Sequence, residues 1–544
     1  MKALCVLYGG SLESEAFEKT PFFGSGAGDN GETTAFSLAL AAAARFPGVQ
    51  KTVFLGIEGK EYPGLNAGIE TVLRPSWNRK SFFEELSKLS LSYDLTYFAW
   101  ADCPLLDPEL AGALAERHRR FAAEYSYADG WPHGFSPEIL SPGTAGILAK
   151  ILCDDEGPVE RDALFMAIQK DINAFDIETE ISPVDLRPYR LCLAADSKRN
   201  LLLLSRLMNA GLRRACDAEK LLSEKPELLR TLPAFFNIQV SSACPQECSL
   251  CPYPAYGNAG APVTARRDFM SASNFASLLD KIAAFAGDAV ISLSLWGEIS
   301  LHPEKMELIK MVLERPALSL VLETSGIGWK EDELKALALA ASNAPKRKNP
   351  LGHRTEGAAC KAPLSWVVSL DAHESARYKE VRGPGFAEAQ ANAEKILSLF
   401  PGNAYVQAVR VRGAEDDIEQ FYRFWRDKGK ALGYGNDTNH IIIQKYDDFA
   451  GTLPKMQVSD LSPVRRRACW HIQRDMNILL DGRVPCCRED LAALKGTGSK
   501  DWGNVFNEEL SIIWERGERL YLEHCKKNYE GICAGCDEYY TFNF

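Results

Sequence analysis

Between residues 235 and 444, apolar segments of strand length alternate with segments that have the apolar periodicity of helices. The expected strands cover residues 235–240, 291–295, 318–322, 366–370, 406–411 and 440–444. The helical patterns between them cover residues 272–285, 304–314, 387–399 and 416–428. This alternation is typical of βαβ units, which build a parallel sheet and gather functional groups at the carboxyl ends of the strands.

Three cysteines follow the first of these strands on one short loop. Cys244, Cys248 and Cys251 have CX3CX2C spacing. Soft thiolates suit iron–sulfur clusters, and three of them can hold three corners of a four-iron cube. One iron is then open to another ligand, as in catalytic rather than structural metal sites. A zinc site or chance clustering is the alternative, although zinc ribbons generally use two CxxC pairs.

The motifs after the next strands resemble those of the radical S-adenosylmethionine (SAM) enzymes. The second strand ends in Gly297 and Glu298, similar to the family's GGEP motif with Trp296 in place of its first glycine. A carboxylate at this position can accept a charge-assisted hydrogen bond from an amino group. The third strand ends in a turn similar to Thr-Asn-Gly, and the fourth carries polar residues at its end. The resemblance implies SAM contacts from Gly297, Glu298, Ser325, Ser369 and Asp371.

The same resemblance implies a partial (β/α)6 barrel of the TIM type over residues 234–460. Cys244, Cys248 and Cys251 would hold a catalytic [4Fe–4S] cluster, with SAM on its open iron. The implied reaction is reductive cleavage of SAM to methionine and a 5′-deoxyadenosyl radical, which abstracts hydrogen from a substrate. An external electron donor such as flavodoxin or ferredoxin is implied as a partner.

A second set of cysteines lies in residues 461–544. Residues 476–487 predict a hairpin with Asp-Gly at its turn. The order of cysteine, hairpin, apolar segment and CxxC resembles the SPASM/twitch extension of radical SAM enzymes. It implies an auxiliary [4Fe–4S] cluster held by Cys469, Cys487, Cys533 and Cys536. The choice between Cys486 and Cys487 stays open, Cys525 is a spare ligand, and a four-cysteine zinc knuckle is the structural alternative.

The first 204 residues have their own organisation, for which we expect an α/β/α sandwich. Strands are expected at 3–8, 52–57 and 95–101, and a helix at 33–45. Asp102 ends the third strand, and a carboxylate there suits a Mg²⁺ that bridges nucleotide phosphates. Residues 101–110 resemble a motif of cytidylyltransferase-type nucleotidyltransferases. Residues 190–196 are similar to a later strand of that family, in which Asp196 would face the metal.

The loop after the first strand departs from the nucleotidyltransferase pattern. It contains no arginine between Tyr8 and Lys19, and Lys19 is its only candidate cation. A phosphate cradle needs positive charge or free amides. A degenerate domain that binds a sugar nucleotide, or a structural domain, is therefore favoured over an active transferase.

The order of the modules resembles the spiro-SPASM family. The expected divisions are a nucleotidyltransferase-like domain at 1–204, a helical linker at 205–233, the barrel at 234–460 and the cluster-binding extension at 461–544. The expected substrate is a peptide, a protein or a sugar-derived compound such as a sugar nucleotide. The alternative function is a nucleotidyltransferase or sugar-nucleotide-binding protein whose cluster domain is regulatory or structural.

Composition limits which cellular compartment and which classes of partner we expect for this protein. The net charge of -11 argues against nucleic acid as a main partner. The 15 cysteines are clustered rather than spread as a disulfide framework, and the N-terminal apolar run is too short for a signal peptide. No run of 18 apolar residues predicts a membrane span. We expect a cytoplasmic enzyme without a membrane partner.

Overall fold

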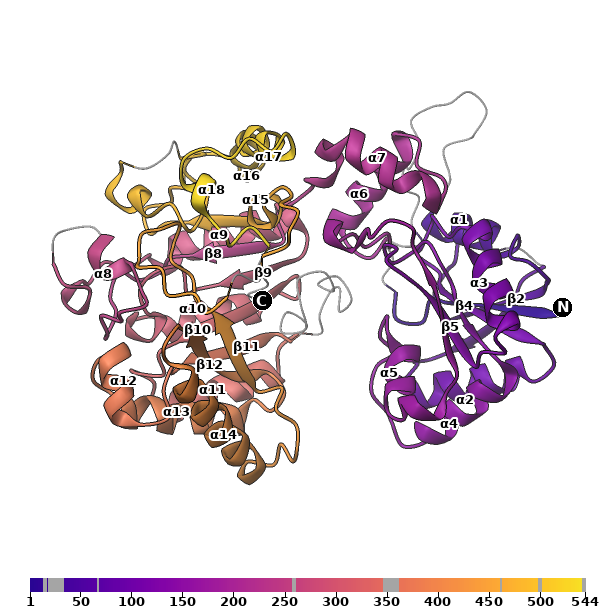
Figure 1. The fold of residues 1–544 in the computed structure, drawn as a ribbon, viewed down its shortest axis with the longest axis horizontal. Helices are drawn as coiled ribbons and strands as arrows, with labels where there is room; N and C mark the ends of the chain where they lie inside the picture. Colours follow the sequence, from indigo (N-terminus) through magenta and orange to yellow (C-terminus); the bar gives the residue numbers. More distant parts are fainter. Residues whose placement is uncertain are drawn as a thin grey trace. The chain divides into compact units, whose positions relative to one another are not determined.

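The computed structural model describes residues 1–12, 17, 34–65, 68–256, 261–345, 362–459, 462–497 and 501–540. Two compact units divide the chain, unit 1 at Met1–Leu229 and unit 2 at Arg230–Phe544. Each unit is built around a seven-stranded sheet (Figure 1). The predicted α/β fold class is confirmed, because both sheets are mainly parallel and both carry helices.

The sheet of unit 1 has the strand order β3-β2-β1-β4-β6-β5-β7. Strand β6 runs antiparallel to β4 and β5, and the other neighbours are parallel. Every residue of β1 and β4 is buried, as expected for central strands covered on both faces. The strands are β1 (Ala3–Tyr8), β2 (Val49–Ile57), β3 (Glu70–Arg74), β4 (Leu95–Trp100), β5 (Tyr125–Asp129), β6 (Glu138–Leu140) and β7 (Ile177–Ile181).

Helices follow most strands of unit 1. Asp107 caps α3 by accepting hydrogen bonds from two amides of the first turn, and Pro108 begins the helix. Residues 198–224 contain two helices, of which the second lies within the expected helical linker at 205–233 and the first begins before it. The helices are α1 (Ala35–Ala43), α2 (Arg79–Ser90), α3 (Pro108–Arg120), α4 (Pro142–Ile151), α5 (Ala163–Gln169), α6 (Lys198–Asn209) and α7 (Ala218–Glu224).

One predicted strand of unit 1 is wrong. Residues 190–196 form no strand, and only Cys192 makes an isolated bridge, to His133. Arg190 ends a 3₁₀ turn at Arg187–Tyr189 with a φ of 52°, in the left-handed region, so no strand begins at this residue. Lys19, the candidate cation of the loop after β1, lies outside the described residues.

The sheet of unit 2 has the order β13-β12-β11-β10-β9-β8-β14, and every neighbouring pair is parallel. The six predicted barrel strands are therefore present as consecutive neighbours. The strands are β8 (Phe235–Ile238), β9 (Ala289–Ser292), β10 (Leu318–Thr324), β11 (Leu364–Ser369), β12 (Ala404–Arg410), β13 (Ile441–Lys445) and β14 (Asp475–Ile478).

Helices α9, α10, α13 and α14 of unit 2 pack against strands of the sheet (Figure 1). Helix α14 shows why: Phe421, Trp425 and Gly429 are buried on one face, while charged residues fill the rest of its surface. The helices are α8 (Tyr253–Tyr256), α9 (Ala272–Ala286), α10 (Lys305–Leu313), α11 (Glu331–Ser342), α12 (Ser375–Val381), α13 (Phe386–Leu399), α14 (Glu415–Ala431), α15 (Trp470–Arg474), α16 (Leu510–Arg516), α17 (Glu518–Cys525) and α18 (Ile532–Gly535).

Strand β14 joins the C-terminal region to the barrel sheet. It was expected as the first arm of a hairpin, but it pairs in parallel with β8, with Asn477 opposite Asn237. The predicted turn is present, because the Leu479 amide donates to the Arg483 carbonyl at 2.8 Å. The segment after the turn forms no strand in the described part of the chain. The hairpin prediction is correct for the turn and wrong for the pairing.

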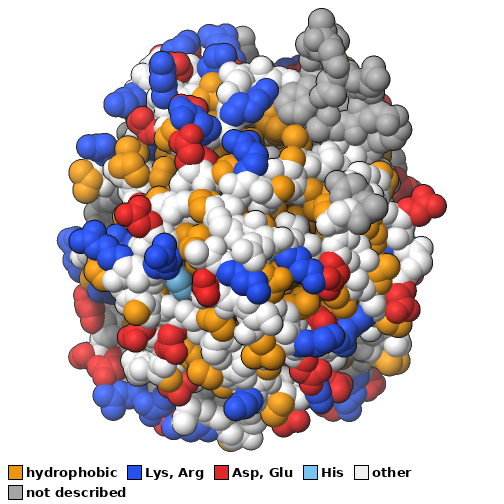
Figure 2. Space-filling model, turned by 90° about the vertical axis from the view of Figure 1, so that its right-hand side faces the viewer, with side chains coloured by type: hydrophobic (Ala, Val, Ile, Leu, Met, Phe, Trp, Pro, Cys, Tyr) orange, Lys and Arg blue, Asp and Glu red, His pale blue; other side chains and the backbone are white. Residues whose placement is uncertain are grey.

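Charge is mixed over the surface that Figure 2 shows. Basic and acidic side chains alternate there with scattered apolar ones, so neither sign dominates this face. Among the described helices, none has the length and apolar character needed to cross a membrane.

Candidate active site

A cavity of about 270 Å³ lies at the carboxyl ends of the strands of unit 2. Its lining includes all three cysteines of the CX3CX2C loop and all five residues predicted to contact SAM. These residues come from β8, β9, β10 and β11 or from the loops that follow them. The parallel sheet brings them together because all of its strands end at the same edge. They are Cys244, Cys248, Cys251, Gly297, Glu298, Ser325, Ser369 and Asp371.

The cysteine loop is anchored on both sides. The Cys244 amide donates to the Val263 carbonyl at 3.1 Å, and the Ser249 amide donates to the Val381 carbonyl at 2.9 Å. Cys251 donates its amide to the Cys248 carbonyl, which turns the loop back on itself. The three thiols are therefore presented from a fixed backbone rather than from a free loop.

The turn after β9 packs directly against the start of the cysteine loop. The Glu298 amide donates to the Ala243 carbonyl at 2.7 Å. Gly297 has a φ of 82°, and a Cβ there would lie 2.0 Å from the Ser241 carbonyl oxygen. Only glycine fits this approach. The turn thus positions the residue that directly precedes Cys244.

The Glu298 carboxylate is held by the next strand end. It accepts hydrogen bonds from the Ser325 amide at 2.7 Å and the Thr324 hydroxyl at 2.7 Å. Burial raises the pKa of Glu298, although these donors oppose the shift. The carboxylate therefore links the ends of β9 and β10. Its contact with the SAM amino group stays a prediction.

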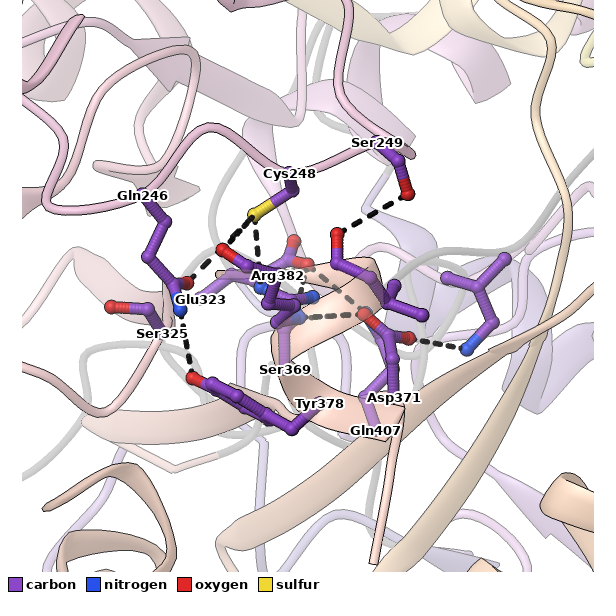
Figure 3. A network of polar contacts seen from close by, with 12 residues as sticks. Gln246, Cys248, Ser249, Glu323, Ser325, Ser369, Asp371, Tyr378, Arg382 and Gln407 are labelled. Atoms are coloured by element: carbon purple, nitrogen blue, oxygen red, sulfur yellow. Dashed lines mark hydrogen bonds and ion pairs between the residues drawn. The ribbon is translucent and has the colours of Figure 1, made fainter. Parts of the chain in front are cut away.

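Asp371 and Arg382 form an ion pair beside Cys248 (Figure 3). The Arg382 Nε donates to the Asp371 carboxylate at 2.6 Å, and the Val409 amide donates to its other oxygen at 2.7 Å. The Arg382 Nη1 lies 4.0 Å from the Cys248 sulfur. Burial raises the pKa of Cys248, while the Arg382 charge opposes this shift. Arg382 thus places a positive charge next to one of the three thiols.

A second polar group extends along the strand ends (Figure 3). The Ser369 hydroxyl donates to the Glu323 carboxylate at 2.9 Å, and the Gln407 amide donates to the same oxygen at 3.0 Å. Gln407 also donates to the Ser369 hydroxyl at 3.2 Å. These three side chains line the cavity from three adjacent strands. They offer hydrogen-bonding groups to a polar ligand such as a ribose.

Aromatic rings form another part of the lining. Trp296 stacks on Tyr253 with ring centroids 5.9 Å apart and lies 5.7 Å from Phe449. Trp296 has a φ of 85° and Phe449 a φ of 51°, values that non-glycine residues adopt only at a cost. Asp371, on the polar side, has a φ of 58°. Strained backbone is thus concentrated around this cavity.

The four cysteines predicted as auxiliary ligands lie near one another in unit 2. Burial raises the pKa of the Cys487 thiol well above its usual value, and the nearby Cys469 and Cys536 thiols raise it further. Burial also raises the pKa of Cys469 to about 12, with Cys533 as a further neighbour. These four thiols come from three separate parts of the sequence, at residues 469, 487 and 533–536.

Cys486 has a different environment from Cys487. Its thiol donates to the Asp490 carboxylate, with the sulfur 3.8 Å from the oxygen. This interaction favours Cys487 over Cys486 as the member of the four-cysteine group. Cys525 is half-buried near the end of α17.

Charged residues in the lining of the cavity pair with one another and with the C-terminal region. Lys445, Asp447 and Arg488 line the cavity. Arg488 directly follows Cys487 and donates to Asp447 at 3.1 Å. Lys445 pairs with Asp537 at 2.8 Å. Burial raises the pKa of Asp447 to about 6, and Arg488 opposes this shift. Arg488 thus lines the cavity and also directly follows a predicted auxiliary ligand.

The donor set at the first cysteine loop fits an iron–sulfur cluster. In the described part of the chain, no group of three His, Cys, Asp or Glu side chains is arranged to hold a single metal ion. Each thiolate of a four-iron cube binds a different iron, so cluster ligands stand further apart than ligands of one ion. Cys244, Cys248 and Cys251 are half-buried, lack disulfide partners and line one cavity.

The two carboxylates singled out in unit 1 also lie together. Asp102 and Asp196 are both within hydrogen-bonding distance of the Arg161 guanidinium, which lies between them. Sequence patterns paired the two aspartates but contained no sign of Arg161.

Several cavity residues were not predicted from the sequence. Glu323 stands at the end of β10, so its position alone was a usable signal. Arg382 follows the fourth strand in an Arg-Gly turn of recognisable spacing, but its ion pair with Asp371 is not indicated by the sequence. The contact of Gln407 with Ser369 is not indicated either. Asp447 and Arg488 come together from distant segments.

No family model matches the chain. A protein of Treponema pallidum (strain Nichols), described as uncharacterized, is 34% identical over 390 residues, which span 70% of this chain and 98% of that protein. The chain belongs to the family of this Treponema protein. The matched length exceeds either unit alone, so the family shares residues of both units.

Two of the solved structures that the chain is similar to cover different shares of it. BtrN, crystallised in complex with AdoMet and 2-DOIA, is 14% identical, with a TM-score of 0.34 over 56% of this chain and 93% of BtrN. A cytidylyltransferase from Leptospira borgpetersenii is 16% identical, with a TM-score of 0.34 over 42% of this chain and 95% of that protein. Both TM-scores are low, so the function proposed below rests on this chain's own residues.

Proposed function

We propose that the protein is a radical SAM enzyme that abstracts hydrogen from a peptide, protein or sugar-derived substrate. The supporting observation is that eight residues, chosen from separate motifs, line one cavity at the carboxyl ends of the strands. Those motifs are spread from Cys244 to Asp371, so their convergence does not follow from closeness in the sequence.

The cysteine loop would hold a [4Fe–4S] cluster through three irons and leave the fourth open. When bound, this group supplies the electron that cleaves SAM to methionine and a 5′-deoxyadenosyl radical. Cys244, Cys248 and Cys251 fix its position because their loop is anchored on both sides. Arg382 adds a positive charge beside Cys248, which stabilises a more reduced, more negative cluster.

The rest of the cavity suits SAM and a substrate that must be kept from water. Ser369, Glu323 and Gln407 offer donors and acceptors in a fixed arrangement. Trp296 and Tyr253 present a stacked aromatic wall to the cavity that the cysteines line. An apolar wall there would help to keep water away from a reactive carbon radical, which uncontrolled side reactions would otherwise consume.

An auxiliary [4Fe–4S] cluster would be held by Cys469, Cys487, Cys533 and Cys536. The mutual proximity of these thiols and the burial of Cys469, Cys487 and Cys533 support this assignment. A cluster with four protein ligands has no open iron, so electron transfer is the role that fits it. It could take an electron from the substrate radical, and the net reaction would then be an oxidation.

Anaerobic reconstitution with iron and sulfide, followed by reduction in the presence of SAM, tests the proposal. We expect the wild type to bind about eight irons per chain and to release 5′-deoxyadenosine. Cys248→Ala should lose about half of the iron and all of the 5′-deoxyadenosine. Cys153→Ala is the matched control, because Cys153 is an exposed cysteine of unit 1. Equal product from wild type and Cys248→Ala would overturn the proposal.

The same measurement separates the auxiliary ligands. Cys487→Ser should lower the iron content by about four per chain while SAM cleavage without substrate continues. Cys486→Ser should keep the iron of the wild type, since its thiol is engaged with Asp490. Loss of iron in Cys486→Ser with full iron in Cys487→Ser would reverse the assignment.

A further inference from the structure

Arg161 lies between the two carboxylates that the sequence suggested as a metal site. Its Nη1 donates to Asp102 Oδ1 at 2.9 Å, and its Nη2 donates to Asp102 Oδ2 and, at 2.9 Å, to Asp196 Oδ2. The exposed fraction of the side chain is 2% for Arg161, 0% for Asp102 and 3% for Asp196. The guanidinium therefore bridges both acids in a site that water does not reach.

The remaining carboxylate oxygen is also engaged. Asn200, in the first turn of α6, donates its side-chain amide to Asp196 Oδ1 at 2.7 Å. Each of the four carboxylate oxygens thus accepts a hydrogen bond from a side chain of unit 1. This matters because Mg²⁺ binds through carboxylate oxygens at about 2.0–2.1 Å and needs them unobstructed.

Arg161 is held in place from two further directions. Its guanidinium lies over the Trp100 ring, 4.7 Å from the centroid, at the end of β4. The Trp100 indole nitrogen donates to the Arg161 carbonyl at 3.3 Å. Burial opposes the charge of Arg161, yet the two carboxylates hold its pKa well above the usual value. The side chain is therefore charged and cannot swing aside without breaking several buried contacts.

A divalent cation does not fit beside this arginine. It would meet a like charge at hydrogen-bonding range in a dry site, where repulsion is far stronger than in water. Displacing the arginine would instead leave its charge buried without a partner. The residues present therefore do not fit the Mg²⁺ that the nucleotidyltransferase resemblance implies.

We propose that Arg161 permanently takes the place of a divalent cation between Asp102 and Asp196, so that unit 1 performs no metal-dependent nucleotidyl transfer. The guanidinium links Asp102, which follows β4, to Asp196, which precedes α6. Any nucleotide or sugar nucleotide that unit 1 binds is then bound without a metal at these acids.

Titration of the full-length reconstituted protein with Mn²⁺, followed by electron paramagnetic resonance of the free ion, tests the proposal. We compare the wild type with Asp196→Asn, in which the paired hydrogen bonds between Arg161 and Asp102 can persist. The proposal expects the same Mn²⁺ binding in both, and no pyrophosphate release from CTP and Mg²⁺ in either. A Mn²⁺ site or a pyrophosphate signal that Asp196→Asn abolishes would overturn it.

A second variant tests the substitution directly. Arg161→Met keeps much of the side-chain volume but removes the charge, which leaves two carboxylates to repel each other. It should melt at a lower temperature than the wild type and regain stability when Mn²⁺ or Ca²⁺ is added. The wild type should show no such gain. A cation-dependent rise in the wild type that equals the rise in Arg161→Met would contradict the proposal.

Discussion

At Gly297 the backbone of the β9 turn meets the strand end that leads into the cysteine loop. The contact is so close that an added Cβ would lie 2.0 Å from the Ser241 carbonyl oxygen. Gly383 has a similar backbone, with a φ of 97°, but no described atom lies within 4 Å of the corresponding position. Substitution of Gly383 therefore measures the free-energy cost of a side chain at positive φ alone. Substitution of Gly297 adds the cost of a steric clash.

We predict that Gly297→Ala is far more damaging than Gly383→Ala. The control should lose about 1 kcal/mol of unfolding free energy, the cost of a side chain at positive φ. Gly297→Ala should lose clearly more and should bind less iron, because the Ser241 segment must move away with the cysteine loop. Urea unfolding and iron analysis check both effects. Equal losses in the two variants would show that the clash is relieved without moving the loop.

The sequence motifs predict many of the residues that line the cavity, but they do not predict the contacts that these residues make. A sequence motif points to Gly297 and Glu298. In the structure, the Glu298 carboxylate accepts a hydrogen bond from the Ser325 amide, and the Glu298 amide donates to the carbonyl of the residue before Cys244. Arg161 was not selected at all, because nothing in the local sequence distinguishes a buried arginine from a surface one. Partners of this kind depend on tertiary contacts.

At the scale of elements, the apolar strands and amphipathic helices of the barrel were predictable because their patterns are long and periodic. Strand β7 was missed since its residues are half-buried or exposed and carry no clear alternation. The sequence of β14 predicts a hairpin, because its actual pairing with β8 joins residues 240 positions apart, which no local pattern reveals. Local patterns predict elements well, but long-range pairing is invisible to them.

His118 of helix α3 forms hydrogen bonds to residues of two other elements, and its protonation should make the stability of unit 1 depend on pH. The Nδ1 of His118 lies 2.8 Å from the Ser126 hydroxyl, and Nε2 lies 3.1 Å from the Ser141 hydroxyl. Burial lowers the pKa of His118 to about 4. Its unfolded value is about 6.5. Between these values the unfolded chain binds a proton that the folded chain does not, so stability falls as the pH is lowered.

We therefore expect unit 1 to lose at most about 1.4 kcal/mol per pH unit from this residue between pH 6.5 and 4, with no contribution above pH 7. Hydrogen exchange of the α3 and β5 amides, corrected for the intrinsic rate, measures this local loss. His118→Asn should flatten the dependence. His524→Asn in unit 2 is the matched control, because burial lowers the pKa of His524 to about 4 as well. An unchanged slope in His118→Asn would contradict the assignment.

At the scale of the whole molecule, the proposed radical chemistry belongs to unit 2 alone. Every residue that lines the cavity lies in unit 2, and so do both sets of cysteines. Arg230, the first residue of the unit, lies over the Trp514 ring at 3.6 Å and donates to the Ile472 carbonyl. The start of the unit is thus held by its C-terminal region.

We predict that a protein of residues 230–544 binds both clusters and cleaves SAM at a rate similar to that of the full chain. A protein of residues 230–460 should be insoluble, because it lacks β14 and leaves the edge of β8 open. Iron content, 5′-deoxyadenosine release and gel filtration check both. A soluble 230–460 protein that binds iron would show that the barrel is complete without β14.

The pairing of β8 with β14 also sets an order of events during synthesis. Strand β8 and the cysteine loop leave the ribosome early, but their sheet partner follows 240 residues later. Until then β8 has an unpaired edge, which is a risk for misassembly. The cysteine loop directly follows β8, so it is attached to a strand that gains this neighbour only after residues 475–478 have emerged.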